Sequence, residues 1–174
     1  MGNKSKKLTP RQLEQQRLCT DTLLRIQASQ NKEERLTILR EIAQNPGAWA
    51  TDALFHCLED PCEMIRDFLI DSLSRRDNLN PDHIQAKLHS SPWFVKSAIL
   101  KIFGLQKKPE WTYAIEDVLK EPNADVRRTA AQTLGDIGGK DALNLLLVLA
   151  KDSNRFVQLS AEKALHKISD LKFS

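Results

Sequence analysis

The apolar residues of this chain recur every three or four positions, in short segments separated by polar turns. In the clearest segment, 124–138, Val126, Ala130 and Leu134 follow one another at intervals of four residues. This spacing places the three side chains on one stripe of an α-helix. No segment shows the alternation of apolar and polar positions that predicts a β-strand. The pattern therefore predicts an all-α fold.

The helical stripe returns about every 31 residues along the chain. Its first position is held by Ile65, Val95, Val126 and Val157, which are separated by 30, 31 and 31 residues. The residues four and eight positions later are apolar in each of these copies, and a weaker copy begins at Glu34. A period of this length is typical of stacked helical repeats.

A second helix is predicted before each copy of the stripe, near 9–28, 48–58, 81–88, 110–120 and 141–150. The glycines at 104, 135, 138 and 139 are expected to end helices. A pair of such short helices cannot bury both apolar faces, whereas a stack of pairs can. We therefore predict an α-solenoid of about five antiparallel helix pairs.

The stretch DVRRTAAQTLGDIG at 125–138 resembles the HEAT-like repeats, especially the short kind named after bilin lyases. In that family an aspartate is followed by a Val-Arg pair, by alanine positions and by Leu-Gly. The resemblance covers about residues 31–168 and is weakest at 31–43 and 90–104. It implies a HEAT-like superhelix, which we expect to form a single domain over 9–174 after a flexible basic tail at 1–8. It does not imply one function, because such repeats are binding scaffolds in many proteins.

In HEAT-like repeats an acidic residue and an arginine six positions later tend to form a ladder between units. The matching pairs here are Asp60 with Arg66 and Glu121 with Arg127. We interpret these four residues as a structural ladder, with ligand binding by the arginines as the alternative. Two further copies have weaker pairs at these positions, Ser90 with Lys96 and Asp152 with Gln158.

Side chains that point away from the buried stripe are candidates for binding a partner. They lie two, six and nine positions after the stripe begins, and would line the concave face of a solenoid. Their charge changes from acidic to basic along the array, which could steer a partner of complementary charge; a solvated polar face is the alternative. Ser97, Gly104 and Gly135 share these positions, and Trp93 is a candidate anchor or a junction residue. The predicted partner-binding residues are Asp67, Asp71, Trp93, Lys101, Arg128, Gln132 and Lys163.

The helix ALNLLLVLA at 142–150 is apolar on nearly all sides, although it belongs to the last repeat. Terminal repeats of a solenoid usually turn a polar face outward. We expect an exposed apolar surface here, covered by the C-terminal segment DLKFS at 170–174 or by a second protein chain.

The net charge of +3 equals the contribution of Lys4, Lys6 and Lys7 in the tail, so the folded body is close to neutral. Nucleic-acid-binding domains usually carry a basic surface, so nucleic acid is not the favoured partner. Three cysteines without a secretory signal indicate reduced thiols, and we expect a cytoplasmic protein. The longest apolar run is too short to cross a membrane.

No P-loop, GxSxG motif, HExxH motif or Cys/His cluster occurs in the sequence, so no catalytic residue, cofactor or metal ligand is predicted. We predict that the chain is not an enzyme but a scaffold that binds a protein or peptide on its concave face. The alternatives are a bilin lyase subunit, a HEAT-like DNA glycosylase and a nucleic-acid-binding module. The oligomeric state is left open.

Overall fold

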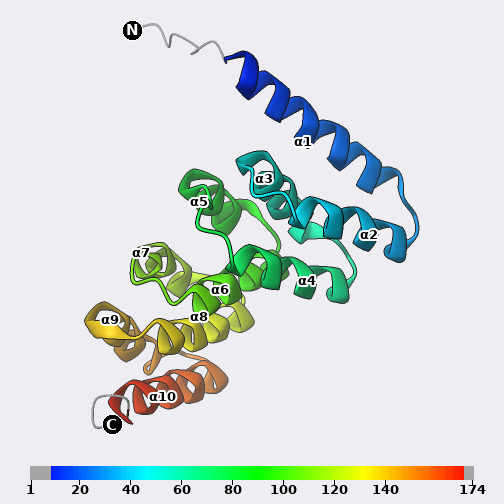
Figure 1. The fold of residues 1–174 in the computed structure, drawn as a ribbon. Coiled ribbons are helices and arrows are strands. Elements are labelled where there is room, and N and C mark those ends of the chain that lie inside the picture. The colour runs from blue at the N-terminus through cyan, green and yellow to red at the C-terminus, as the bar shows by residue number, and fades with distance from the viewer. Residues whose placement is uncertain (1–8, 171–174) are drawn as a thin grey trace, which may run out of the picture. The chain divides into compact units, whose positions relative to one another are not determined.

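A computed structural model describes residues 9–170, which form ten α-helices and two short 3-10 helices without any strand (Figure 1). The predicted basic tail at 1–8 and residues 171–174 of the predicted C-terminal cover lie outside the described residues. Helix pairs follow one another along the chain, so the predicted all-α solenoid class is confirmed. The elements are α1 (Pro10–Ala28), α2 (Lys32–Ala43), α3 (Ala48–His56), η1 (Cys57–Glu59), α4 (Glu63–Ser74), α5 (Pro81–Ser90), α6 (Trp93–Gln106), α7 (Trp111–Glu116), η2 (Asp117–Lys120), α8 (Ala124–Ile137), α9 (Gly139–Leu149) and α10 (Arg155–Asp170).

The chain divides into two compact units. The first contains the residues up to Leu69 together with Arg76–Leu79, and the second contains Ile70–Arg75 and the residues from Asn80 onward. The sequence predicts one repeat domain over 9–174, and that remains a prediction.

In the first unit, α1 and α2 both pack against α3. The N-terminus of α1 is closed by Thr9, whose hydroxyl oxygen accepts a hydrogen bond from the Gln12 backbone N–H at 3.3 Å. The core contains Leu39, Leu54 and Leu58, which have no exposed surface. Burial of such side chains supplies most of the stability of short helices, because the helices alone are marginal in water.

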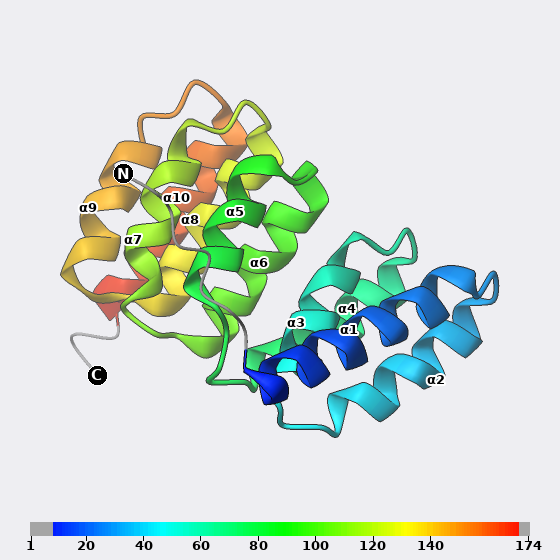
Figure 2. The same cartoon turned by 90° about the horizontal axis from the view of Figure 1, so that it is seen from above.

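In the second unit, α5, α7 and α9 form one layer and α6, α8 and α10 form the other (Figures 1 and 2). The stripe residues Val126, Ala130 and Leu134 of α8 are all completely buried, as the helical period predicts. Trp111 stacks on Phe103 of α6, with ring centroids 4.5 Å apart and an interplanar angle of 8°. Trp111 thus joins the end of one helix pair to the start of the next.

Two of the glycines expected at helix ends lie inside helices instead, so this expectation is corrected. A Cβ atom at Gly135 in α8 would lie 2.7 Å from Cβ of Ala164, and one at Gly104 in α6 would lie 3.1 Å from Oδ2 of Asp136. Both glycines are buried because the adjacent helix approaches closely at these points. Among the glycines that the structure describes, only Gly138 and Gly139 have positive φ angles, of 71° and 86°, and they lie where α8 ends and α9 begins.

A ladder of charged side chains links successive repeats. Each cationic side chain in it binds a carboxylate 25 positions later in the chain, and not a carboxylate six positions earlier. The Asp60 carboxylate does not bind the side chain of Arg66; the Arg66 Nη1 donates instead to the Asp60 backbone oxygen at 2.8 Å. The three side-chain rungs join Arg35 Nε to Asp60 Oδ2 at 2.7 Å, Lys96 Nζ to Glu121 Oε1 at 2.6 Å, and Arg127 Nε to Asp152 Oδ2 at 2.7 Å.

The predicted pair Glu121 and Arg127 is corrected in the same way. Arg127 Nη1 donates to the backbone oxygen of Glu121 at 2.6 Å, while its Nε and Nη2 bind the carboxylate of Asp152 in the next repeat. Asp152 also accepts a hydrogen bond from the Asn154 N–H, so the carboxylate shapes the turn before α10. One arginine therefore stabilises the turn of its own repeat and holds the turn of the following one.

Replacing the buried stripe residue Ala130 by aspartate should unfold the second unit or destabilise it by several kcal/mol. Ala130 is 0% exposed, and a buried unpaired carboxylate is strongly destabilising. Gln132 lies two residues further along α8 and is exposed, so Gln132→Asp should change stability by less than about 0.5 kcal/mol. Thermal denaturation of both variants checks this; equal losses would show that the helical register is wrong.

The hydrogen bond from Arg127 is the main reason that the pKa of Asp152 lies below its ordinary value. The Asp152 carboxylate is therefore protonated at a lower pH in the folded state than in the unfolded state. The resulting stability is fully present above about pH 4 and is lost as the pH falls through the folded pKa. We expect Asp152→Asn to lower the unfolding free energy at neutral pH by about 2 kcal/mol.

The loss caused by Asp152→Asn should shrink on acidification, because the wild-type protein then loses the same contribution. Urea unfolding at neutral pH and near pH 3 measures this change. Asp141→Asn on α9 is the matched control, since Asp141 is exposed. An Asp152→Asn penalty that does not depend on pH would contradict the proposed role of the carboxylate charge.

Candidate functional site

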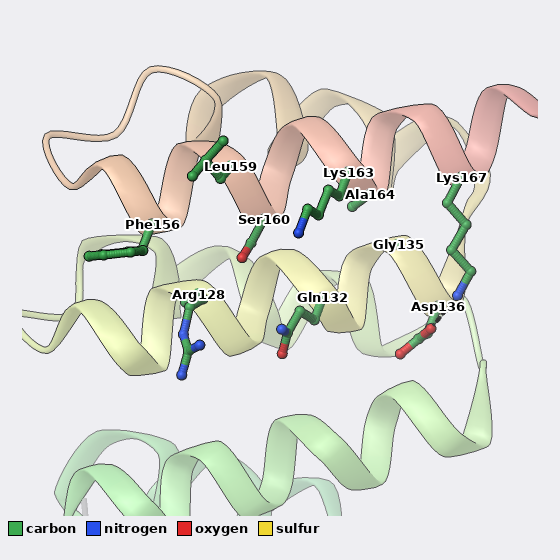
Figure 3. Close-up of a pocket in the computed structure, with 10 residues that line it drawn as sticks. All are labelled: Arg128, Gln132, Gly135, Asp136, Phe156, Leu159, Ser160, Lys163, Ala164 and Lys167. Carbon is green, nitrogen blue, oxygen red and sulfur yellow. Dashed lines mark hydrogen bonds and ion pairs between the residues drawn. The ribbon is translucent and has the colours of Figure 1, made fainter.

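A groove of about 370 Å³ runs between α8 and α10 in the second unit (Figure 3). We call it the α8–α10 groove. Its size lies within the range of sites that hold small ligands or single peptide side chains. The lining residues are Arg128, Gln132, Gly135 and Asp136 from α8, and Phe156, Leu159, Ser160, Lys163, Ala164 and Lys167 from α10.

The groove follows from the helical period of its two walls. On α10, Phe156, Ser160, Lys163 and Lys167 are spaced by four, three and four residues, so they share one face. On α8, Gln132 occupies the corresponding exposed face. Each wall is thus the polar side of a helix whose opposite stripe is buried in the core.

The groove narrows where small residues let the two helices approach each other. Gly135 and Ala164 are both buried, and a Cβ atom at Gly135 would lie 2.7 Å from the Ala164 Cβ. Close to this point the Lys167 Nζ lies 2.5 Å from Oδ1 of Asp136, and the dashed line in Figure 3 marks this contact. The ion pair closes one end of the groove.

Positive charge dominates the groove, because three cationic side chains line it and only one carboxylate. Two of the cations have acidic partners: Lys167 binds Asp136, and the Arg128 Nη2 lies 3.0 Å from Asp125 Oδ1. Lys163 is exposed and has no ion-pair partner among the residues that the structure describes. Its ammonium group is therefore available to an anionic ligand.

An exposed aromatic ring marks the other end of the groove. Phe156 is 71% exposed, and in Figure 3 its ring lies at the end of α10 opposite Lys167, close to Arg128. A second hollow continues beyond it toward the turns at Asn123 and Asn154, and shares Arg128 and Phe156 with the groove. This end of the groove thus combines the apolar ring of Phe156 with the cationic side chain of Arg128.

The structure brings together three of the predicted partner-binding residues, Arg128, Gln132 and Lys163, in the α8–α10 groove. The others are exposed but do not line it: Lys101 lies on α6, and Asp67 and Asp71 lie on α4. The last of them, Trp93, begins α6 and is 52% exposed. Its ring lies edge to face with the ring of Phe94, and the two ring centroids are 6.0 Å apart.

Three of the positions expected to face solvent are buried, so this expectation is corrected. Ser97, Gly104 and Gly135 occupy the wheel positions of the concave face, yet each is covered in the folded structure. The helical period of one helix does not show how closely the neighbouring helix packs, and at Gly104 and Gly135 the neighbouring helix is close enough to cover the residue. The hydroxyl of Ser97 is buried without a hydrogen-bond partner among the described residues.

Sequence reasoning missed Phe156, Ser160, Asp136 and Lys167 as groove residues. The candidate positions on α10 were counted forward from Val157, the first stripe residue, so Phe156 was not among them. A search along α10 for exposed residues spaced like Phe156, Ser160, Lys163 and Lys167 would have found three of the four. The position of Asp136 depends on the neighbouring helix.

The described part of the chain contains no group of three or more His, Cys, Asp or Glu side chains placed to hold a metal ion. Over the same residues, no helix combines the length and apolar character that a bilayer crossing requires.

Residues 81–166 match the family model described as HEAT repeats. This range extends from the start of α5 into α10 and includes all the groove residues except Lys167. This match confirms the resemblance to HEAT-like repeats inferred from the sequence. No curated protein matches the chain.

The chain is also similar to a solved structure, the complex of CpcE and CpcF of phycocyanin lyase from Nostoc sp. PCC7120. The match has a TM-score of 0.58 and 17% sequence identity, and it covers 98% of this chain and 68% of that chain. At this level of identity the similarity shows a common fold.

This similarity corrects the prediction that the chain is not an enzyme, because the matching structure is that of a lyase. That prediction depended on the absence of short catalytic motifs. In a helical repeat array, however, a site is assembled from side chains about 31 residues apart, such as Arg128 and Leu159 in the groove. Such a site leaves no contiguous motif in the sequence.

Proposed function

We propose that this chain binds a protein partner through the α8–α10 groove. The observation that carries the proposal is the combination of an exposed aromatic residue, Phe156, with an exposed lysine, Lys163, about two turns further along α10. Exposed aromatic residues and cations are frequent anchors of protein interfaces. Because both come from packed helices, binding costs little ordering of the site.

The charge distribution favours a protein over a nucleic acid. The groove has three cations, but Asp136 lies in it and Asp125 lies beside Arg128. Nucleic acids are bound through a row of phosphate contacts, which requires a basic surface without interspersed carboxylates. A partner with one or two acidic groups fits this surface better than a phosphate backbone.

The remaining predicted contacts, Trp93 and Lys101 on α6, extend this proposal beyond the groove. Lys101 is exposed, and Trp93 has about half of its surface exposed. A partner larger than a short peptide could reach α6 as well as α8 and α10, because the three helices form one layer (Figures 1 and 2). The partner-binding roles of Asp67 and Asp71 also remain predictions.

The cysteines support the proposed cytoplasmic location. Cys19, Cys57 and Cys62 form no disulfide within the described residues, which is usual for proteins in a reducing compartment. Cys57 is buried, and burial raises the pKa of the Cys19 thiol. A raised thiol pKa disfavours the reactive thiolate form.

Photo-crosslinking from the groove tests the proposed partner. Benzoylphenylalanine in place of Gln132 should capture a specific protein, whereas the same group in place of Lys140 on α9 should not. The captured protein, identified by mass spectrometry and purified, should bind the double variant Arg128→Glu/Lys163→Glu at least about tenfold more weakly. Melting temperatures should stay close to that of the wild type, because both side chains are exposed.

The double variant Lys140→Glu/Lys151→Glu is the matched control. It makes the same change in net charge at two exposed lysines that do not line the groove. Equal weakening by both double variants would mean that overall charge, and not the groove, determines the affinity. Unchanged affinity of the groove variant would place the binding site elsewhere.

A second candidate function is that of a bilin lyase subunit, which the fold similarity to the phycocyanin lyase structure favours. A bilin combines conjugated apolar rings with two propionate groups. Phe156 could contact a ring, and Lys163 with Arg128 could pair with the propionates. The volume of the groove, about 370 Å³, would accommodate part of such a molecule and leave the rest in the adjoining hollow.

Titration with phycocyanobilin tests this candidate. Binding should shift and intensify the long-wavelength absorbance band, because a held tetrapyrrole loses conformational freedom. The shift should weaken in Arg128→Glu/Lys163→Glu and persist in Lys140→Glu/Lys151→Glu. An unchanged spectrum with the wild-type protein would reject the candidate without affecting the proposal of a protein partner.

A further inference from the structure

We propose that the α8–α10 groove binds an extended acidic segment, in which a large apolar residue and a carboxylate are three positions apart. This inference rests on the proposed function, since it specifies the chemistry of the protein partner. The apolar residue would pack on Phe156, and the carboxylate would pair with Lys163.

The charge of the partner follows from the state of the three cations. Lys167 and Arg128 already lie 2.5 Å and 3.0 Å from carboxylates of Asp136 and Asp125. Lys163 has no such partner within residues 9–170, and in Figure 3 its side chain lies between the two helices. A carboxylate on the ligand is therefore the group that complements the free cation.

The apolar anchor follows from Phe156. The residue is 71% exposed, and contact with a ligand side chain would remove apolar surface from water. Aromatic pairs gain additional stabilisation from their edge-to-face or offset geometry. Arg128 lines the same end of the groove, so an aromatic ligand residue could also contact its guanidinium group.

The spacing of the two ligand residues follows from the helix that carries the anchors. Phe156 and Lys163 are seven residues apart in α10, which corresponds to about 10.5 Å along the helix axis. In polyproline II conformation, residues three apart lie on the same face and about 9 Å apart. A β-strand places same-face residues about 7 Å or 13 Å apart, which matches the anchors less well.

Polar groups between the two anchors can bind the backbone of such a segment. Ser160 lies between Phe156 and Lys163 on α10, and Gln132 faces it from α8 (Figure 3). A polyproline II backbone has no internal hydrogen bonds, so its carbonyl and N–H groups are free to bond to these side chains. Beyond Lys163, the ion pair of Lys167 with Asp136 limits how far the segment extends.

Fluorescence anisotropy with short labelled peptides tests this inference on the full-length chain. The probe is Ser-Gly-Trp-Pro-Pro-Glu-Gly-Ser. It is accompanied by the peptide with Trp and Glu exchanged, because the two anchors do not fix the direction in which the peptide runs along the groove. The better of the two should bind at least about tenfold more tightly than the same peptide with Lys in place of Glu. Moving the Glu next to the Trp should also weaken binding.

Variants of the two anchors connect the peptide preference to the structure. Lys163→Glu should reverse the preference, so that the Lys peptide binds better than the Glu peptide. Lys163→Arg should keep it, because it keeps the charge. Phe156→Ala should weaken both peptides, and Lys140→Glu on α9 should change neither. Because Phe156, Lys163 and Lys140 are all exposed, the variants are expected to fold.

Equal affinity for the Glu and Lys peptides, or a preference that Lys163→Glu leaves unchanged, would overturn the inference. So would displacement of the peptide by single-stranded oligothymidine with a steep salt dependence, which would indicate a nucleic-acid site. A protein that crosslinks at position 132 through a segment without acidic residues would overturn this inference and leave the proposed function intact. Absence of any crosslinked protein would reject the proposed function itself.

Discussion

The close approach of α8 and α10 at Gly135 and Ala164 is the constraint on which the candidate site depends. A Cβ atom at Gly135 would lie 2.7 Å from that of Ala164, so the observed helix spacing requires glycine at this position. The helices thus meet near Lys167 and Asp136, which form an ion pair, and leave a groove along the rest of their length. This contact therefore sets the end of the groove at which Lys167 and Asp136 lie.

The charged ladder links the same two helices at a second point, near the start of α10. Arg127 on α8 binds the Asp152 carboxylate with two nitrogen atoms, at 2.7 Å and 2.9 Å, just before α10 begins. Both side chains are largely buried, so the pair is protected from solvent and has a defined geometry. Arg127 therefore stabilises the packing of successive repeats, while its neighbour Arg128 lines the groove. Two adjacent arginines of one motif serve different purposes because they lie 100° apart on the helix.

The HEAT repeats of residues 81–166 explain why the chemistry of this chain is hard to read from motifs. Each repeat contributes only a few exposed side chains, and neighbouring repeats place them together. Phe156 and Lys163 come from one helix, whereas Gln132 comes from the preceding repeat. The same scaffold occurs in a phycocyanin lyase structure, so the absence of a contiguous motif is compatible with catalysis as well as with binding.

The sequence by itself determined the helical period, the ten helices and the exposure of Arg128, Gln132 and Lys163. These properties are local, because the 3.6-residue helical turn sets which side of a helix a residue occupies. Only the tertiary structure decided that Asp152 is the carboxylate partner of Arg127, that Gly104 and Gly135 are buried inside helices, and that Phe156 borders a groove. Each of these depends on how closely a second helix approaches and in which register. A periodic pattern along one helix contains no information about that distance, which is decided by the packing of side chains from different repeats.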